Sequence, residues 1–242
     1  MSGISWLTAR PIAHRGLHDM NKTVWENTLP AFARALEANY AIECDVHLTA
    51  DGVPIVFHDS DLKRLTGTEG NVWQKDAAEL RALTIGSTRD HPPTLDDMLD
   101  FVGGRVPLVI ELKGVAGHDA GLVEAVADLL GQYAGKAAIM SFDHWLVREF
   151  KHAAPRIAAG LTACGREQSD LEAHFSMLAH DLDFISYGID DMPNPFVDLV
   201  RNRLSMPVIT WTVRNPHDVE KTARLADQMT FEGFVPDETP NP

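Results

Sequence analysis

The sequence predicts a (β/α)8 barrel, the TIM-barrel class, on three observations. Short runs of strand-forming residues alternate with longer stretches whose apolar residues recur at helical spacing. Eight such runs in 242 residues match the usual size of this barrel. The sequence contains no GxGxxG or GxxxxGK[ST] motif, which a doubly wound nucleotide-binding sheet often carries.

The expected strands are four to seven residues long and, joined by right-handed helical crossovers, would form a parallel sheet. They are Pro11–His14, Ile42–Leu48, Leu108–Leu112, Ala138–Ser141, Ile157–Leu161, Phe184–Tyr187, Val208–Val213 and Gln228–Phe231. The expected helices are Leu29–Ala38, Leu95–Val102, Ala120–Tyr133, His144–Ala153, Gln168–Leu178, Phe196–Leu204 and Pro216–Leu225.

One long interruption lies between His58 and Val106. Within it, Ile55–His58 could form an extra strand and Thr66–Gly70 a turn. We interpret residues 55–95 approximately as an excursion on the barrel rim, too short for a second domain. The prediction is therefore one domain over residues 1–242.

The composition of the chain excludes some classes of binding partner. The chain is 45% hydrophobic and carries a net charge of -14, so its surface repels nucleic acid and anionic membranes. A small anion can still bind where a cluster of cations or a metal ion reverses the local field. With no apolar leader and no run of 18 apolar residues, the sequence predicts a cytoplasmic protein without membrane insertion. Its oligomeric state is left open.

Ionisable residues cluster where the expected strands end, and reactive groups of such barrels lie at these carboxyl ends. Glu43 and Asp45 are two residues apart on one strand, so both carboxylates face the same side. Glu111 and Lys113 repeat this spacing on the next barrel strand. Three converging carboxylates favour a hard divalent cation, Mg²⁺ or Ca²⁺, over zinc.

A charge count indicates what this site could bind. Three carboxylates against the cations of Arg15 and Lys113 leave the site net negative, and a divalent cation makes it net positive by one. A phosphodiester would neutralise that charge, and the metal, Arg15 and Lys113 would hold the charge that develops in the transition state.

Two histidines complete the pattern. His14 ends the first strand, and His58 follows the short extended run Ile55–Phe57. Cleavage of a phosphate ester needs a base for the attacking oxygen and an acid for the leaving oxygen, and two histidines can supply both.

The chain resembles the glycerophosphodiester phosphodiesterases, in particular a shorter bacterial branch. The resemblance rests on an ordered set of short sequences spread over nearly the whole chain. They are Ile12-Ala13-His14-Arg15-Gly16, Glu26-Asn27-Thr28, Glu43-x-Asp45-Val46, Asp51-Gly52, Val56-Phe57-His58-Asp59, Leu62-x-Arg64-x-Thr66, Pro93-Thr94-Leu95, Glu111-x-Lys113, Ser141-Phe142-Asp143 and Trp211-Thr212-Val213.

The resemblance implies a phosphoric diester hydrolase that converts a glycerophosphodiester to glycerol phosphate and an alcohol, using Mg²⁺ or Ca²⁺. It implies metal ligation by Glu43, Asp45 and Glu111. It also implies a mechanism in which a glycerol hydroxyl attacks phosphorus first and water then opens the cyclic phosphate.

The resemblance further implies acid/base roles for His14 and His58 and phosphate contacts for Arg15 and Lys113. Which histidine is the base is left open.

Two aromatic residues are expected to line the substrate pocket. Trp211 would pack against the glycerol or alcohol part, with Phe142 beside it, although both could equally be core residues. Glu26 and Asn27 are expected to hold the first loop or cap the following helix rather than contact phosphate.

Two other functions are compatible with these residues. One is a phospholipase D-like hydrolase acting on lysolipid, which would need an apolar entrance. The other is a non-catalytic phosphate-binding barrel, which would be expected to lack at least one acid/base or metal residue, although this sequence retains them all.

Overall fold

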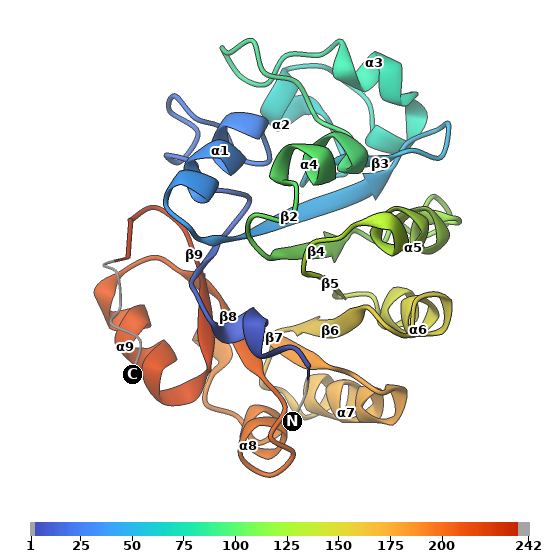
Figure 1. The fold of residues 1–242 in the computed structure, drawn as a ribbon. Helices are drawn as coiled ribbons and strands as arrows, with labels where there is room; N and C mark the ends of the chain where they lie inside the picture. Colours follow the sequence, from blue (N-terminus) through green and yellow to red (C-terminus); the bar gives the residue numbers. More distant parts are fainter. Residues whose placement is uncertain (1–2, 237–242) are drawn as a thin grey trace.

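The computed structural model describes residues 3–236 and contains the predicted barrel (Figure 1). Eight strands run parallel, and the barrel closes because β1 pairs with both β2 and β9. The barrel strands are β1 (Ile12–Ala13), β2 (Ala41–Leu48), β4 (Leu108–Leu112), β5 (Ala137–Ser141), β6 (Ala158–Ala163), β7 (Phe184–Gly188), β8 (Val208–Val213) and β9 (Gln228–Phe231).

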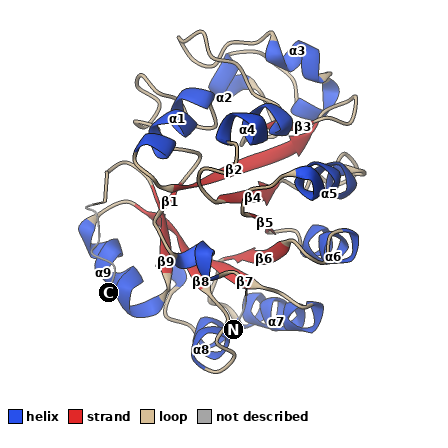
Figure 2. Cartoon of the chain, viewed as in Figure 1, coloured by secondary structure: helices blue, strands red, loops and turns tan. Residues whose placement is uncertain are grey.

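Helices surround the strands on the outside, as Figure 2 shows. All seven predicted helices are present, with ends within three residues of the expected ones. They are α1 (Leu29–Glu37), α4 (Leu95–Val102), α5 (Leu122–Gln132), α6 (His144–Ala153), α7 (Gln168–Met177), α8 (Pro195–Asn202) and α9 (Pro216–Leu225). None of the described helices is long and apolar enough to span a membrane.

The excursion contains more regular structure than the sequence indicated. The extra strand exists as β3 (Pro54–Val56), antiparallel to β2, and it is followed by two short helices, α2 (Lys63–Thr66) and α3 (Ala77–Arg81). These helices are too short for their periodicity to show. A small apolar cluster of their own holds them together: Ile55, Phe57, Leu62, Leu65, Val72, Leu80 and Ile85.

Side chains alternate between the barrel interior and the helices along each strand. On β4, Val109 and Glu111 face inward, whereas Leu108, Ile110 and Leu112 pack with the outer core. The amino end of the interior is filled by apolar side chains and closed by the 3-10 helix Ser5–Thr8, which places Leu7 there. The carboxyl end is charged.

The loop after β1 requires glycine at position 16. Gly16 has φ +79°, and a Cβ atom there would lie 2.9 Å from Ala31 and from the Phe32 ring. The close approach packs this loop against α1, whose N-cap is Thr28.

We expect Gly16→Ala to lower the free energy of unfolding by roughly 3 kcal/mol, because it adds a steric clash to an unfavourable φ. Gly52→Ala is the matched control, since Gly52 has φ +78° with no atom near a Cβ, and it should cost only about 1 kcal/mol. Urea unfolding of both variants measures the difference. Equal losses would show that packing around Gly16 is unimportant.

Candidate active site

The residues expected to form the site come from neighbouring strands at the carboxyl end of the barrel. Glu43 and Asp45 lie on β2, Glu111 lies opposite Asp45 on β4, and His14 directly follows β1. The strand register therefore brings together side chains that are far apart in sequence.

Three carboxylates converge inside the barrel mouth. Oxygens of Glu43, Asp45 and Glu111 lie within 4.8 Å of one another, and all three residues are buried. We call this group the carboxylate cluster. It contains only oxygen donors, the set that hard divalent cations prefer, so the cluster could hold a metal ion.

The three carboxylates of the cluster differ in how their pKa values are shifted. Burial, with Asp45 and Glu111 beside it, raises the pKa of Glu43 well above its usual range. Burial also raises the pKa of Glu111, although Lys113 partly offsets the effect. Burial acts to raise the pKa of Asp45 too, but Lys113 and Arg15 outweigh it and hold that pKa below its usual range. Asp45 is thus the well-compensated carboxylate of the three.

Two cations face the cluster. The ammonium of Lys113 lies 2.9 Å from Asp45 Oδ1 and also bonds Glu111. The guanidinium of Arg15 lies 3.2 Å from Asp45 Oδ2, and its Nη1 donates to Glu26 at 2.7 Å. The backbone amide of Arg15 donates to Glu43 Oε2 at 2.9 Å. Arg15 therefore contacts the cluster through both backbone and side chain.

His14 is held by a carboxylate from the other side of β1. Its Nδ1 lies 2.5 Å from Glu232 Oε2, just after β9, while its Nε2 lies 3.9 Å from Glu43. Because a carboxylate only accepts, we assign Nδ1 as the protonated donor, which leaves Nε2 turned toward the cluster. Burial lowers the pKa of His14, and Glu232 partly opposes this.

His58 is likewise bonded to a carboxylate through Nδ1. Its Nδ1 bonds Asp59 Oδ1 at 2.6 Å, so its Nε2 is also left free by this contact. Asp59 in turn accepts from Arg64 at 2.6 Å, and Arg64 bonds Glu26, the partner of Arg15. A chain of alternating charges thus connects Arg15, at the carboxylate cluster, to His58.

The two aromatic residues form a pair. Phe142 and Trp211 follow or lie within β5 and β8, and their ring centroids are 5.4 Å apart at 85°. The indole Nε1 of Trp211 donates to the Ser186 carbonyl, which fixes the ring, whereas Phe142 is 45% exposed.

Comparisons with known proteins identify the family of this chain. The sequence profile of the Glycerophosphoryl diester phosphodiesterase family matches residues 14–239. The chain belongs to this family.

A glycerophosphodiester phosphodiesterase from Caldanaerobacter subterraneus subsp. tengcongensis is 29% identical over 238 residues, covering 94% of this chain and 93% of the relative. Among solved structures, a Silicibacter pomeroyi protein described under the same family name is 28% identical with a TM-score of 0.79, covering 92% and 89% of the two chains. An Oleispira antarctica phosphodiesterase, solved with the product sn-glycerol-3-phosphate, has the same fold at 24% identity and a TM-score of 0.79, covering 93% and 92%. The predicted family, enzyme class and fold are therefore confirmed.

Sequence reasoning missed two side chains of the candidate site. Glu232 is a lone acid after the last strand, 218 positions from His14, and nothing in its surroundings signals the contact. Asn27 holds the first loop as expected, because its backbone amide donates to the Arg15 carbonyl at 2.9 Å, and Thr28 rather than Asn27 caps α1. The unexpected contact is that of its side chain, which donates to Asp45 at 2.9 Å. Its place in the Glu-Asn-Thr motif was the available signal.

The Arg15–Glu26–Arg64 network of this phosphodiesterase makes stability depend on pH. Burial acts to raise the pKa of Glu26, but Arg64 and Arg15 outweigh it and lower the pKa to about 2. A carboxylate with a lowered folded pKa stabilises the fold above its unfolded pKa, and this contribution is lost as pH falls through the folded value.

We expect the free energy of unfolding of the wild type to fall as the pH is lowered from about 4.5 to 2. In Glu26→Gln this fall should be smaller by a few kcal/mol, because the variant has no carboxylate to protonate at this position. Urea unfolding at a series of pH values measures this slope. Glu69→Gln, which removes an exposed carboxylate, serves as the control. A Glu26→Gln slope equal to that of wild type would contradict the assignment.

Proposed function

We propose that this chain is a metal-dependent hydrolase that converts a glycerophosphodiester to glycerol phosphate and an alcohol, with His14 and His58 as the acid/base pair. The observation that carries the proposal is the carboxylate cluster, buried between two cations and flanked by two carboxylate-bound histidines. Family membership supports the substrate class.

The residues present fit a divalent cation, Mg²⁺ or Ca²⁺. Three buried carboxylates carry one more charge than Arg15 and Lys113 together, and burial, with Asp45 and Glu111 beside it, raises the pKa of Glu43. Glu43, Asp45 and Glu111 would hold the ion. When bound, it would polarise the phosphoryl oxygens and attract the negative substrate.

Arg15 and Lys113 would contact the phosphate. Both are anchored by the carboxylates, so their positions are set before substrate arrives. Developing charge on the phosphoryl oxygens would then meet preorganised donors, which need little rearrangement in the transition state.

The histidines would move the protons. One Nε2 accepts the proton of the attacking hydroxyl as its oxygen bonds to phosphorus, and the other gives a proton to the alcohol oxygen as its bond to phosphorus breaks. Glu232 and Asp59 keep Nδ1 as the donor in each ring, so Nε2 is the reactive atom in both.

The aromatic pair would bind the organic part of the substrate. The edge-to-face packing of Phe142 on Trp211 presents a partly exposed apolar wall near the ends of β5 and β8. A glycerol or alcohol group could pack there.

Lysolipid hydrolysis is the second candidate, and one observation favours it. Phe142 is 45% exposed and Trp145, three residues later at the start of α6, is 65% exposed. These side chains could receive an acyl chain.

The metal prediction tests the reaction itself. Removal of metal with a chelator should abolish release of glycerol phosphate from glycerophosphocholine, and Mg²⁺, Ca²⁺ or Mn²⁺ added back singly should restore it. Faster turnover of lysophosphatidylcholine would favour the second candidate. Full activity in excess chelator would exclude metal dependence, and tight diester binding without turnover would indicate a non-catalytic barrel.

His14→Ala and His58→Ala should each lower kcat by about 10²–10⁴-fold while the circular dichroism spectrum stays unchanged. His217→Ala, at an exposed position on α9, is the control and should keep full activity. A loss smaller than tenfold for either site variant would remove that histidine from the mechanism.

Glu232→Gln should lower kcat by about 10–100-fold with little change in KM, because the amide keeps the size but loses the charge that orients His14. Glu220→Gln, on the exposed side of α9, is the matched control. If Glu232→Gln has wild-type kcat, the contact with His14 is only structural.

A further inference from the structure

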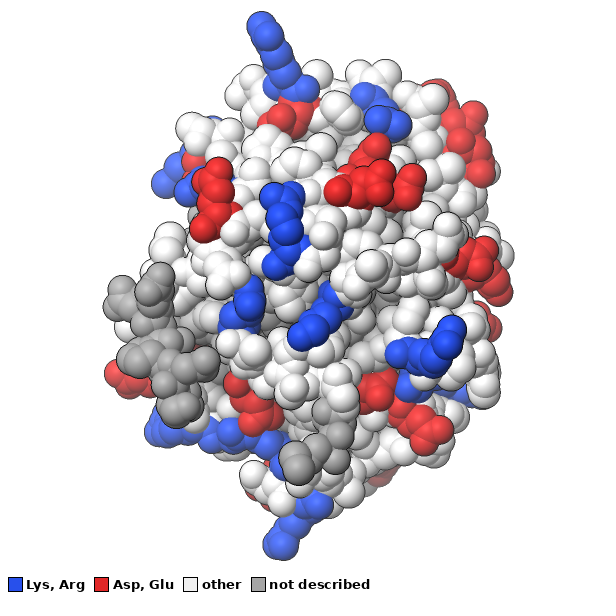
Figure 3. All heavy atoms as spheres, viewed as in Figure 1, with Lys and Arg blue, Asp and Glu red and all other residues white. Residues whose placement is uncertain are grey.

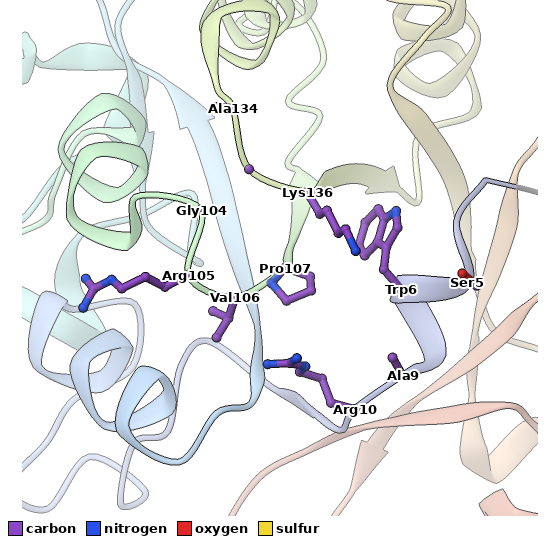
Figure 4. A pocket seen from close by; sticks show the side chains of 11 residues that line it. Ser5, Trp6, Ala9, Arg10, Gly104, Arg105, Val106, Pro107, Ala134 and Lys136 are labelled. Carbon is purple, nitrogen blue, oxygen red and sulfur yellow. The ribbon is translucent and has the colours of Figure 1, made fainter. Parts of the chain in front are cut away.

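A pocket opens at the amino end of the barrel, opposite the end that holds the carboxylate cluster. Its volume is about 450 Å³, and it lies between the 3-10 helix Ser5–Thr8 and the segments that lead into β4 and β5. Figure 4 shows the side chains that line it. We call it the basal pocket.

The basal pocket is positive in an otherwise acidic protein. Arg10, Arg105 and Lys136 line it, and its lining contains no Asp or Glu among residues 3–236. The whole chain has 35 acidic residues against 21 Lys and Arg. Within the described part of the chain, none of these three cations is in an ion pair with a carboxylate. Their charge is therefore available to a ligand.

Two of the cations, Arg10 and Lys136, are placed to contact a bound ligand. The guanidinium of Arg10 is anchored through Nη1 to the carbonyl and side chain of Asn39, and it points toward Pro107 in Figure 4. Lys136 and the half-buried indole of Trp6 line the same cavity. A fixed guanidinium, an ammonium and an aromatic ring thus surround one cavity.

Arg105 adds charge to the pocket but is not placed to contact a ligand at its centre. Its Nε donates to the Val102 carbonyl at 2.9 Å and its Nη2 to the Phe101 carbonyl, so it caps the end of α4. In Figure 4 its head turns away from Arg10 and Lys136. It adds to the positive field without reaching the cavity centre. Figure 3 shows Lys and Arg side chains near the middle of the face viewed in Figure 1, with Asp and Glu side chains above and below them and further Lys and Arg side chains toward its edge.

We propose that the basal pocket binds a phosphate monoester whose organic part packs against Trp6. Arg and Lys together suit a phosphate dianion, because the guanidinium donates in a fixed geometry and the ammonium adds a compact charge. The volume lies in the range of small-molecule sites and far exceeds what a bare phosphate needs. The aromatic ring supplies the remaining contact surface.

The test separates this pocket from the carboxylate cluster. In protein stripped of metal on a chelating resin, the carboxylate cluster and its two cations stay net negative, so a phosphate dianion should not bind there. Any binding of the dianion that remains therefore reports on the basal pocket. Calorimetric titration with phenyl phosphate should give one site per chain. Phenol and inorganic phosphate should each bind at least about tenfold more weakly.

Variants locate the site. Lys136→Gln should weaken phenyl phosphate binding about tenfold, and Lys136→Arg should restore most of it. Arg156→Gln is the matched control, because Arg156 precedes β6 at the same barrel end, is exposed and does not line the pocket. All three variants should keep wild-type hydrolysis of glycerophosphodiesters, so the result is independent of the proposed function.

Several outcomes would overturn the proposal. They are the absence of phenyl phosphate binding, an unchanged affinity in Lys136→Gln, and an equal loss in Arg156→Gln, which would indicate non-specific attraction. Equal affinity for inorganic phosphate would exclude a role for Trp6, and equal affinity for phenol would exclude a role for the cations.

Discussion

Mutual repulsion among three carboxylates inside the barrel mouth is the constraint around which the site is arranged. Glu43, Asp45 and Glu111 are buried within a few ångströms of one another, and buried charges are stable only when paired. Lys113 and Arg15 hold the pKa of Asp45 below its usual range, whereas burial first, and the neighbouring carboxylates second, raise the pKa of Glu43 and of Glu111. A cation bound among these carboxylates would relieve their repulsion, which is why the cluster could hold a metal ion.

The surrounding charges form an ordered network rather than a random collection of ion pairs. Arg15 links the carboxylate cluster to Glu26, Arg64 links Glu26 to Asp59, and Asp59 holds His58. The excursion contributes Arg64 through its short helix α2, so its small apolar cluster indirectly positions a proposed catalytic histidine. This gives the rim segment a functional reason for its internal packing.

Much of this could be predicted from sequence, because strand periodicity is local. The two-residue spacing of Glu43 and Asp45, and of Glu111 and Lys113, fixed their side of the sheet, and the order of strands placed them at one end. Contacts set by barrel closure could not be predicted in this way. Glu232 meets His14 only because β9 pairs with β1, and no local pattern encodes that distance. The cations of the basal pocket likewise come from three loops with no shared motif.

The two-residue strand β1 has a consequence for how the protein acquires activity. It closes the ring of strands, because it pairs with β2 on one side and with β9 on the other, and His14 directly follows it. The imidazole then contacts Glu43 from one neighbour and Glu232 from the other. The contacts of His14 with both carboxylates therefore exist only in the closed barrel, so closure of the strand ring and completion of this part of the site are the same structural event.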